Sequence, residues 1–97
     1  MLFLVRIEVN LDPGMAAGDR SALLEAERRR GEELKSEGLI VDIWRIPGRV
    51  ANYGLWRAPS PSVLHEALTS LPVFPFTRIE VTALAAHHLT TDPSQVA

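Results

Sequence analysis

Segments with the two-residue hydrophobic period of a strand and segments with the 3.6-residue period of a helix follow each other along the chain. Their order constrains the fold more than any other feature. Residues 2–10 alternate between faces as a half-buried strand does. One face carries Phe3, Val5, Ile7 and Val9, and the other carries Leu2, Leu4, Arg6 and Glu8. Asp12-Pro13-Gly14 then forms a turn. A long, highly charged helix is predicted from an N-cap at Asp19 to about Glu37, with Gly38 as its C-cap.

Three further strands are predicted from the same alternation. Residues 39–46 and 50–57 are joined across Pro47-Gly48, a connection short enough for an antiparallel hairpin. Residues 77–84 alternate near the end of the chain. One face of this last strand carries Ile79, Val81 and Ala83.

A second helix lies between the hairpin and the last strand. Ser60 has the residue type of an N-cap, and Pro61 suits the first helical position. The apolar stripe of this helix consists of Leu64, Ala67, Leu68 and Leu71. Pro72 and Pro75 end the helix, and the chain closes with a polar tail over residues 85–97.

The resulting order, βαββαβ, predicts one ferredoxin-like α+β domain over residues 1–84. Right-handed crossovers fold that order into a four-stranded antiparallel sheet with both helices on one face. The other face would carry Leu2, Leu4 and one of two sets, either Ala51, Tyr53 and Leu55 or Val50, Asn52, Gly54 and Trp56. A patch of that size predicts a homo-oligomer built from sheet-to-sheet dimers. The tail is then free to pack on a neighbouring subunit.

Composition narrows the classes of function. With 97 residues and 46% hydrophobic content, the chain is long enough for one core only. Ten Lys and Arg face 12 Asp and Glu, so no basic excess exists for nucleic acid or an anionic membrane. The chain has no Cys, no signal-peptide pattern and no stretch of ~18 apolar residues. These features predict a cytoplasmic protein.

Glu27 is the sharpest anomaly of the first helix. Leu23, Leu24 and Leu34 fall within an arc of roughly 100° around the helix axis, and Glu27 lies inside that arc. Burial there disfavours the charged carboxylate and raises its pKa, as a general base working near neutral pH requires. The alternative is that Glu27 forms an ion pair with a buried arginine, either Arg6 or Arg45.

Further polar candidates surround the predicted hairpin. Arg45 interrupts an apolar run of Leu39, Val41 and Ile43, so its guanidinium serves either a buried carboxylate or an anionic ligand. Asn52 and Tyr53 are candidate donors, or else hairpin and interface residues. Trp44 and Trp56 are core or pocket-wall residues. His87 and His88 are a weak ligand set, so no metal is expected.

Three stretches of sequence resemble a known family. They are MLFLV, IWRIPGRVANY and SLPVFPFTRIEV, and they resemble the muconolactone delta-isomerases from Met1 to about Leu84. The pattern W-R-I-x-G-x-x-A-N-Y followed by L-P-x-F-P-[FY]-x-x-I-E-V is specific as a set. The resemblance implies a ferredoxin-like fold, assembly of dimers into a larger ring, and a cofactor-independent isomerase.

The implied reaction converts muconolactone to 3-oxoadipate enol-lactone in the β-ketoadipate pathway of aromatic-compound catabolism. It is an allylic proton shift that needs a positioned base, donors for a developing oxyanion and a cation for the carboxylate. Glu27 matches the family's acid and is the expected base. Arg45, Asn52, Tyr53 and Trp44 are the expected substrate-binding residues.

The chain also departs from the family pattern. Leu4 replaces a His, residues 40–43 replace W-R-H-x, and Val50 and Phe76 each replace a Tyr. These changes alter polarity around the expected pocket, so a substituted or different lactone is a possible substrate. Two rival functions also stay open: a cofactor-free oxygenase or cyclase of the dimeric α+β barrel type, and a non-catalytic module that binds a small molecule.

Overall fold

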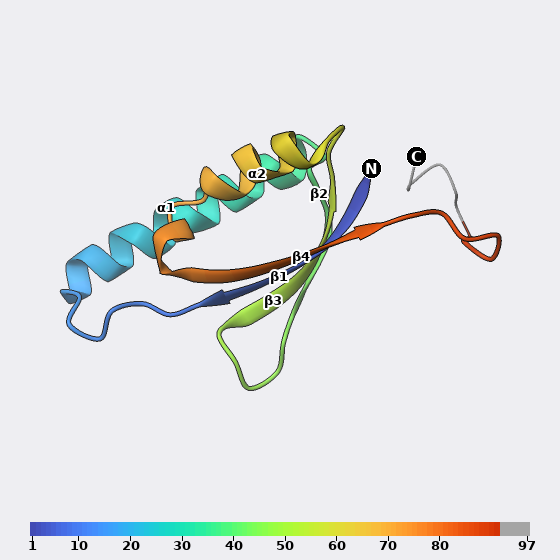
Figure 1. The fold of residues 1–97 in the computed structure, drawn as a ribbon. Helices are drawn as coiled ribbons and strands as arrows, with labels where there is room; N and C mark the ends of the chain where they lie inside the picture. Colours follow the sequence, from blue (N-terminus) through green and yellow to red (C-terminus); the bar gives the residue numbers. More distant parts are fainter. Residues whose placement is uncertain (92–97) are drawn as a thin grey trace.

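A computed structural model describes residues 1–91 of the chain. Its elements are β1 (Leu2–Val9), α1 (Ala17–Ser36), β2 (Ile40–Arg45), β3 (Ala51–Arg57), α2 (Pro61–Thr69), the 3-10 helix η1 (Phe74–Phe76) and β4 (Thr77–Leu84). The sheet has the order β2-β3-β1-β4, and all neighbours are antiparallel. Both helices cover one side of it (Figure 1). The predicted ferredoxin-like fold is confirmed.

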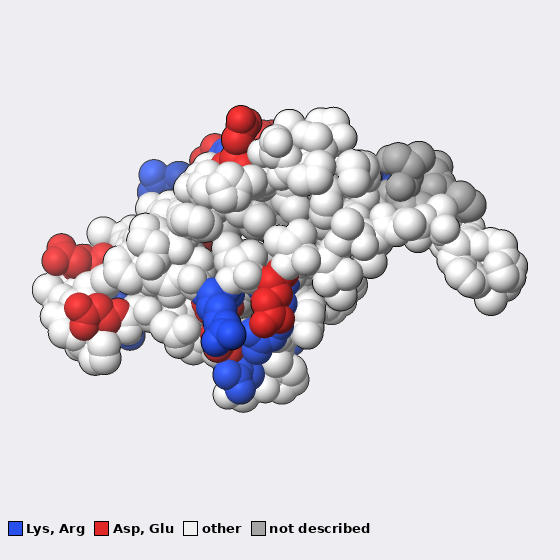
Figure 2. Space-filling model, in the orientation of Figure 1, with Lys and Arg blue, Asp and Glu red and all other residues white. Residues whose placement is uncertain are grey.

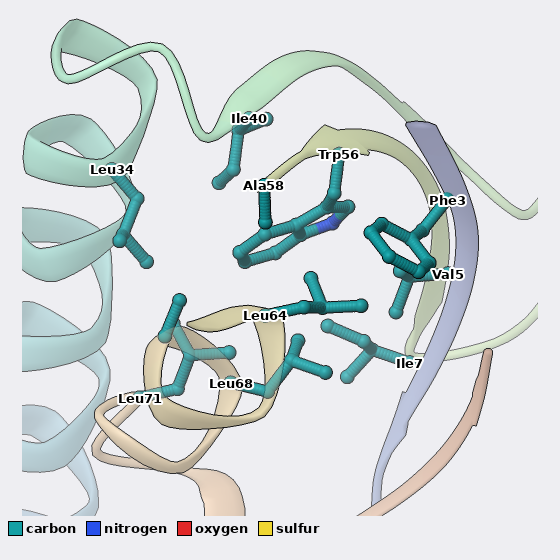
Figure 3. Close-up of a cluster of buried hydrophobic side chains, with 11 residues drawn as sticks. Phe3, Val5, Ile7, Leu34, Ile40, Trp56, Ala58, Leu64, Leu68 and Leu71 are labelled. Carbon is teal, nitrogen blue, oxygen red and sulfur yellow. The ribbon is translucent and has the colours of Figure 1, made fainter. Parts of the chain in front are cut away.

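The hydrophobic core lies between α2 and the central strands. Phe3 of β1 pairs with Trp56 of β3 in the register, so both side chains point to the helix-covered face. The apolar stripe of α2 meets them there, and α1 adds Leu34 (Figure 3). All four predicted stripe residues are buried. Leu71 lies beyond the end of α2, which stops at Thr69 before the chain continues toward η1.

Two of the three capping signals in the sequence are confirmed. The Ser60 side chain accepts a hydrogen bond from the Val63 N–H at 3.2 Å, as an N-cap does. Gly38 has a φ of +85° after α1, and the Gly38 and Leu39 N–H groups bond to carbonyls of the last turn. Asp19 is not the N-cap, because α1 begins at Ala17. Its carboxylate lies in the first turn, where the negative charge interacts favourably with the positive end of the helix dipole.

A bulge in β2 changes the predicted face assignments. The register shifts between Ile40, which pairs with Trp56, and Asp42, which pairs with Leu55. Val41 is therefore the extra residue, and the simple alternation of positions 39, 41, 43 and 45 is broken. Ile43 and Arg45 now share the helix-covered face with Ile40. This places Arg45 directly opposite Asn52 of β3.

The uncovered face carries the first of the two predicted sets. Tyr53 and Leu55 pair with Arg6 and Leu4 of β1, and Leu4, Trp44 and Tyr53 are 36%, 54% and 42% exposed. Arg6 and Arg49 both bond to the Glu8 carboxylate, at 3.3 and 2.6 Å. Figure 2 shows acidic and basic side chains intermixed near the middle of the molecule rather than sorted by sign.

Two further predictions concern the C-terminal tail and the absence of a membrane span. The predicted tail, residues 85–97, extends past Thr91, so its last part lies outside the described residues. Of residues 1–91, no helix combines the length and apolar character needed to cross a membrane.

Candidate active site

A cavity of about 580 Å³ opens between α1 and the hairpin strands, on the helix-covered side of the sheet. Four of the five predicted site residues line it, together with two further polar side chains. The predicted residues are Glu27, Trp44, Arg45 and Asn52, and the others are Arg20 and Trp56. Most of the remaining wall is apolar and comes from β1, β2 and the segment after α2. The topology thus gathers side chains that lie far apart in the sequence.

Glu27 enters the cavity from the middle of α1. Its side chain is half-buried, and Oε1 accepts a hydrogen bond from the Val73 N–H at 3.2 Å. Burial raises the pKa of this carboxyl above its ordinary value, and the bond from Val73 offsets part of the rise. The other acids of α1 face outward. Glu25 and Glu32 both bind Arg28, and the pKa of Glu25 is lowered as a result.

The ion-pair alternative for Glu27 is wrong. Within residues 1–91, no Lys, Arg or His lies within salt-bridge distance of Glu27. Arg6 is engaged by Glu8 on the other face of the sheet. Glu27 is therefore a partly buried acid that holds one backbone hydrogen bond and no counter-ion, an arrangement that suits proton transfer better than structural pairing.

Arg45 supplies an uncommitted positive charge to the cavity. It is the last residue of β2, and its side chain is exposed. It forms no ion pair with any residue in the part of the chain that the structure describes. A guanidinium that is free and reachable from solvent, at the wall of an apolar cavity, suits a carboxylate ligand.

Asn52 and Tyr53 are separated by the alternation of β3. Asn52 lines the cavity, and its Oδ1 is buried without a hydrogen-bond partner among the described residues. Tyr53 points to the uncovered face, where it pairs with Arg6 and Trp44. The prediction that both residues line one pocket needs correction, because adjacent residues of a strand lie on opposite faces. Tyr53 does not line the cavity of its own chain.

The two tryptophans occupy different environments. Trp44 belongs to the edge strand β2 and is 54% exposed. It borders the cavity at the strand edge, although its pairing with Tyr53 directs its side chain to the uncovered face. Trp56 is 1% exposed, and its Nε1 has no hydrogen-bond partner within residues 1–91. Leaving such a buried N–H unpaired costs roughly 1–3 kcal/mol. The sequence placed Trp56 in the core or pocket wall, but no residue pattern signals an unpaired indole nitrogen.

These features define a class of protein. It is a ferredoxin-like α+β protein that holds one acid of raised pKa in a largely apolar cavity, with a free guanidinium on the wall and two unpaired polar atoms buried beside it. Such a cavity can bind a small organic anion and move a proton on it. In the described residues, no group of three or more His, Cys, Asp or Glu side chains is placed to hold a metal ion.

Comparisons with known proteins agree with this class. The family described as muconolactone delta-isomerase matches residues 1–90. Muconolactone Delta-isomerase 2 of Acinetobacter lwoffii is 40% identical over 90% of this chain and 91% of its own length. Its counterpart from Cupriavidus pinatubonensis is 38% identical over 90% and 95%. A crystal structure of muconolactone isomerase aligns with a TM-score of 0.88 at 36% identity, covering 95% and 96%.

The chain therefore belongs to the muconolactone delta-isomerase family.

Proposed function

We propose that this protein isomerises muconolactone, or a related substituted lactone acid, to the corresponding enol-lactone. The observation that carries the proposal is Glu27, a carboxyl of raised pKa that faces the cavity without a counter-ion among residues 1–91. Membership of the family supports the choice of reaction. The proposal places the protein in aromatic-compound catabolism as a cytoplasmic enzyme.

In the proposed reaction, the Glu27 carboxylate takes the proton from the ring carbon that bears the acetate arm. The electron pair of that C–H bond moves into the ring, the double bond shifts, and negative charge develops on the lactone carbonyl oxygen. Glu27 then returns the proton to the carbon beside that carbonyl. A single base suffices when both carbons present the same face to it. No redox change occurs, so the reaction needs no electron acceptor.

The remaining roles follow from charge and position. Arg45 binds the acetate carboxylate, Asn52 offers an amide to the lactone ring, and Trp44 bounds the cavity at the edge strand. Tyr53 has no part in the mechanism within its own chain, because it lies on the opposite face of the sheet.

Two wall residues favour a substituted lactone over the unsubstituted one. Ile40 and Val50 line the cavity at positions where the resemblance leads one to expect Trp and Tyr. Smaller apolar side chains there leave more room and remove a hydroxyl group. A ring that carries a methyl substituent is the kind of substrate that this wall accommodates.

Arg45→Lys is expected to raise KM by about 10-fold or more while kcat changes little, because a carboxylate contact equal in ground and transition states affects binding alone. Lysine keeps the charge but loses the planar fork. Steady-state kinetics with the free acid and its methyl ester make the comparison. For the methyl ester, Arg45→Lys should change KM little. An equal loss for acid and ester would contradict the assigned role of Arg45.

The protein is also expected to form a homo-oligomer through the uncovered sheet face. Leu4, Trp44 and Tyr53 expose apolar surface together there, more than a soluble monomer usually presents. Light scattering at micromolar concentration should give a mass of at least twice the 10.7 kDa of one chain. Leu4→Glu should lower that mass. A wild-type mass near 10.7 kDa would contradict the prediction.

A further inference from the structure

Trp56 combines two properties that rarely occur together. It is the largest fully buried side chain in the described structure, and its ring belongs to the same cluster as Phe3 and Leu64 (Figure 3). Its Nε1 nevertheless has no hydrogen-bond partner within residues 1–91. Buried indole N–H groups normally find an acceptor. Trp56 also lines the cavity that contains Glu27.

Gly54 determines where the indole nitrogen lies. A Cβ built on Gly54 would stand 2.6 Å from Nε1 and 3.0 Å from Cδ1 of Trp56. The nitrogen edge of the ring therefore occupies the space that any side chain at position 54 would fill. The register places Asn52, Gly54 and Trp56 on one face of β3, opposite Ile7, Val5 and Phe3. Trp56 thus extends back along the strand toward Asn52.

The two unpaired polar atoms belong to residues on the same face of β3. Same-face positions of a strand are separated by roughly 6.7 Å, and Nε1 stands over the position next to Asn52. Asn52 Oδ1 is buried and unpaired as well. Two unpaired polar groups on one strand face, both on the wall of the cavity that Glu27 enters, indicate a place where a polar part of a ligand binds.

We propose that the Trp56 indole N–H is a catalytic hydrogen-bond donor to the lactone carbonyl oxygen of the substrate, and that Gly54 is the positioning residue that gives the indole its place. This inference rests on the proposed isomerase function. A fixed N–H aimed at the oxygen where charge develops stabilises the dienolate more than the ground state. An indole N–H suits this task because it donates only and stays neutral.

Trp56→Phe is expected to lower kcat by roughly 10²-fold to 10³-fold, with a much smaller change in KM, because the lost bond strengthens in the transition state. Phenylalanine keeps an aromatic ring in the core. Gly54→Ala should lower kcat similarly by displacing the indole. The double variant should then be no slower than Trp56→Phe, because the smaller ring no longer meets the added methyl group. Gly18→Ala is the matched control, since nothing lies within 4 Å of its added Cβ.

A spectroscopic measurement tests the contact without any change at Trp56. The ¹⁵N–¹H spectrum of the wild-type protein contains one indole signal from each of Trp44 and Trp56, and Trp44→Phe assigns them. The saturated lactone acid, which lacks the ring double bond and does not react, is the probe. Its binding should move the Trp56 signal downfield as a hydrogen bond forms. A Trp56 signal that stays in place at saturating probe would overturn the inference.

The kinetic outcomes separate this inference from the function on which it rests. Wild-type turnover of the lactone together with a kcat for Trp56→Phe within 2-fold of wild type would overturn the donor role and leave the isomerase intact. Failure of the wild-type protein to convert muconolactone or its methyl-substituted form would overturn the proposed function and this inference with it.

Discussion

Glu27→Gln is expected to reduce kcat by at least ~10²-fold while the protein stays folded, because glutamine keeps the shape of the side chain but cannot accept a proton. Glu32→Gln is the matched control. Glu32 belongs to the same helix but pairs with Arg28 on its outer side, at 2.8 Å, so its replacement should leave kcat near the wild-type value. Near-normal turnover by Glu27→Gln would remove Glu27 from the mechanism, and Asp42 would be the next acid to test.

The same residue predicts the pH dependence. In the free enzyme, kcat/KM should fall as pH decreases through one pKa that lies above the ordinary glutamate value of about 4.3, because burial raises the pKa of Glu27. Glu32→Gln should retain this profile. A profile flat from pH 4 to pH 7 would contradict the assignment of Glu27 as the base.

The contribution of Glu27 to stability should depend on pH in the opposite sense to its contribution to activity. The folded protein holds the Glu27 proton more tightly than the unfolded chain does, so ionisation of Glu27 opposes folding. The associated stability is complete below the unfolded pKa and is lost as pH rises through the higher folded pKa. At neutral pH, Glu27→Gln should therefore unfold at a temperature no lower than that of wild type. Lost activity without lost stability distinguishes a reacting group from a structural one.

Leu34→Ala is expected to lower the free energy of unfolding by roughly 2–5 kcal/mol, the usual cost of truncating a buried leucine. Leu34 is 0% exposed and is the one residue of α1 that is fully buried. Because α1 also carries Glu27 two turns earlier, the truncation should reduce kcat/KM as well. Denaturant unfolding at a fixed protein concentration measures the first effect, since an oligomer's stability depends on concentration.

Leu24→Ala serves as the comparison for Leu34→Ala. It is the same truncation in the same helix, but Leu24 is 45% exposed, so the loss of stability should be clearly smaller. If both variants lost the same free energy of unfolding, Leu34 would not be the residue that anchors α1 to the sheet. The predicted apolar stripe of Leu23, Leu24 and Leu34 is thus only partly buried within one chain.

The fold could be predicted because the two hydrophobic periods and the turn residues agree along most of the chain. The strand at residues 77–84 and the capped start of α2 follow directly from local sequence. The start of α1 could not be located, because Ala16 caps it without any side-chain bond. The bulge at Val41 was also hidden, since an extra residue in an edge strand has no distinct composition.

The candidate site was predictable where chemistry and periodicity coincide. Glu27 stands out as an acid within an apolar stripe, and the structure places it in the cavity. The resemblance predicts Tyr53 there together with Asn52, although alternation along β3 separates them. The unpaired nitrogen of Trp56 could not be predicted from the sequence. It depends on how the ring packs over Gly54, and only the assembled sheet shows that.

The most direct test of the account is a single-turnover reaction in which the purified protein is mixed with muconolactone, or with its methyl-substituted form, in an oxygen-electrode cell. NMR identifies the product. An isomerase should convert at least one lactone to its enol-lactone, without added cofactor and without oxygen uptake. Oxygen consumption coupled to product formation would favour the oxygenase alternative. Binding of both lactones with conversion of neither would contradict the central claim and leave a small-molecule-binding module.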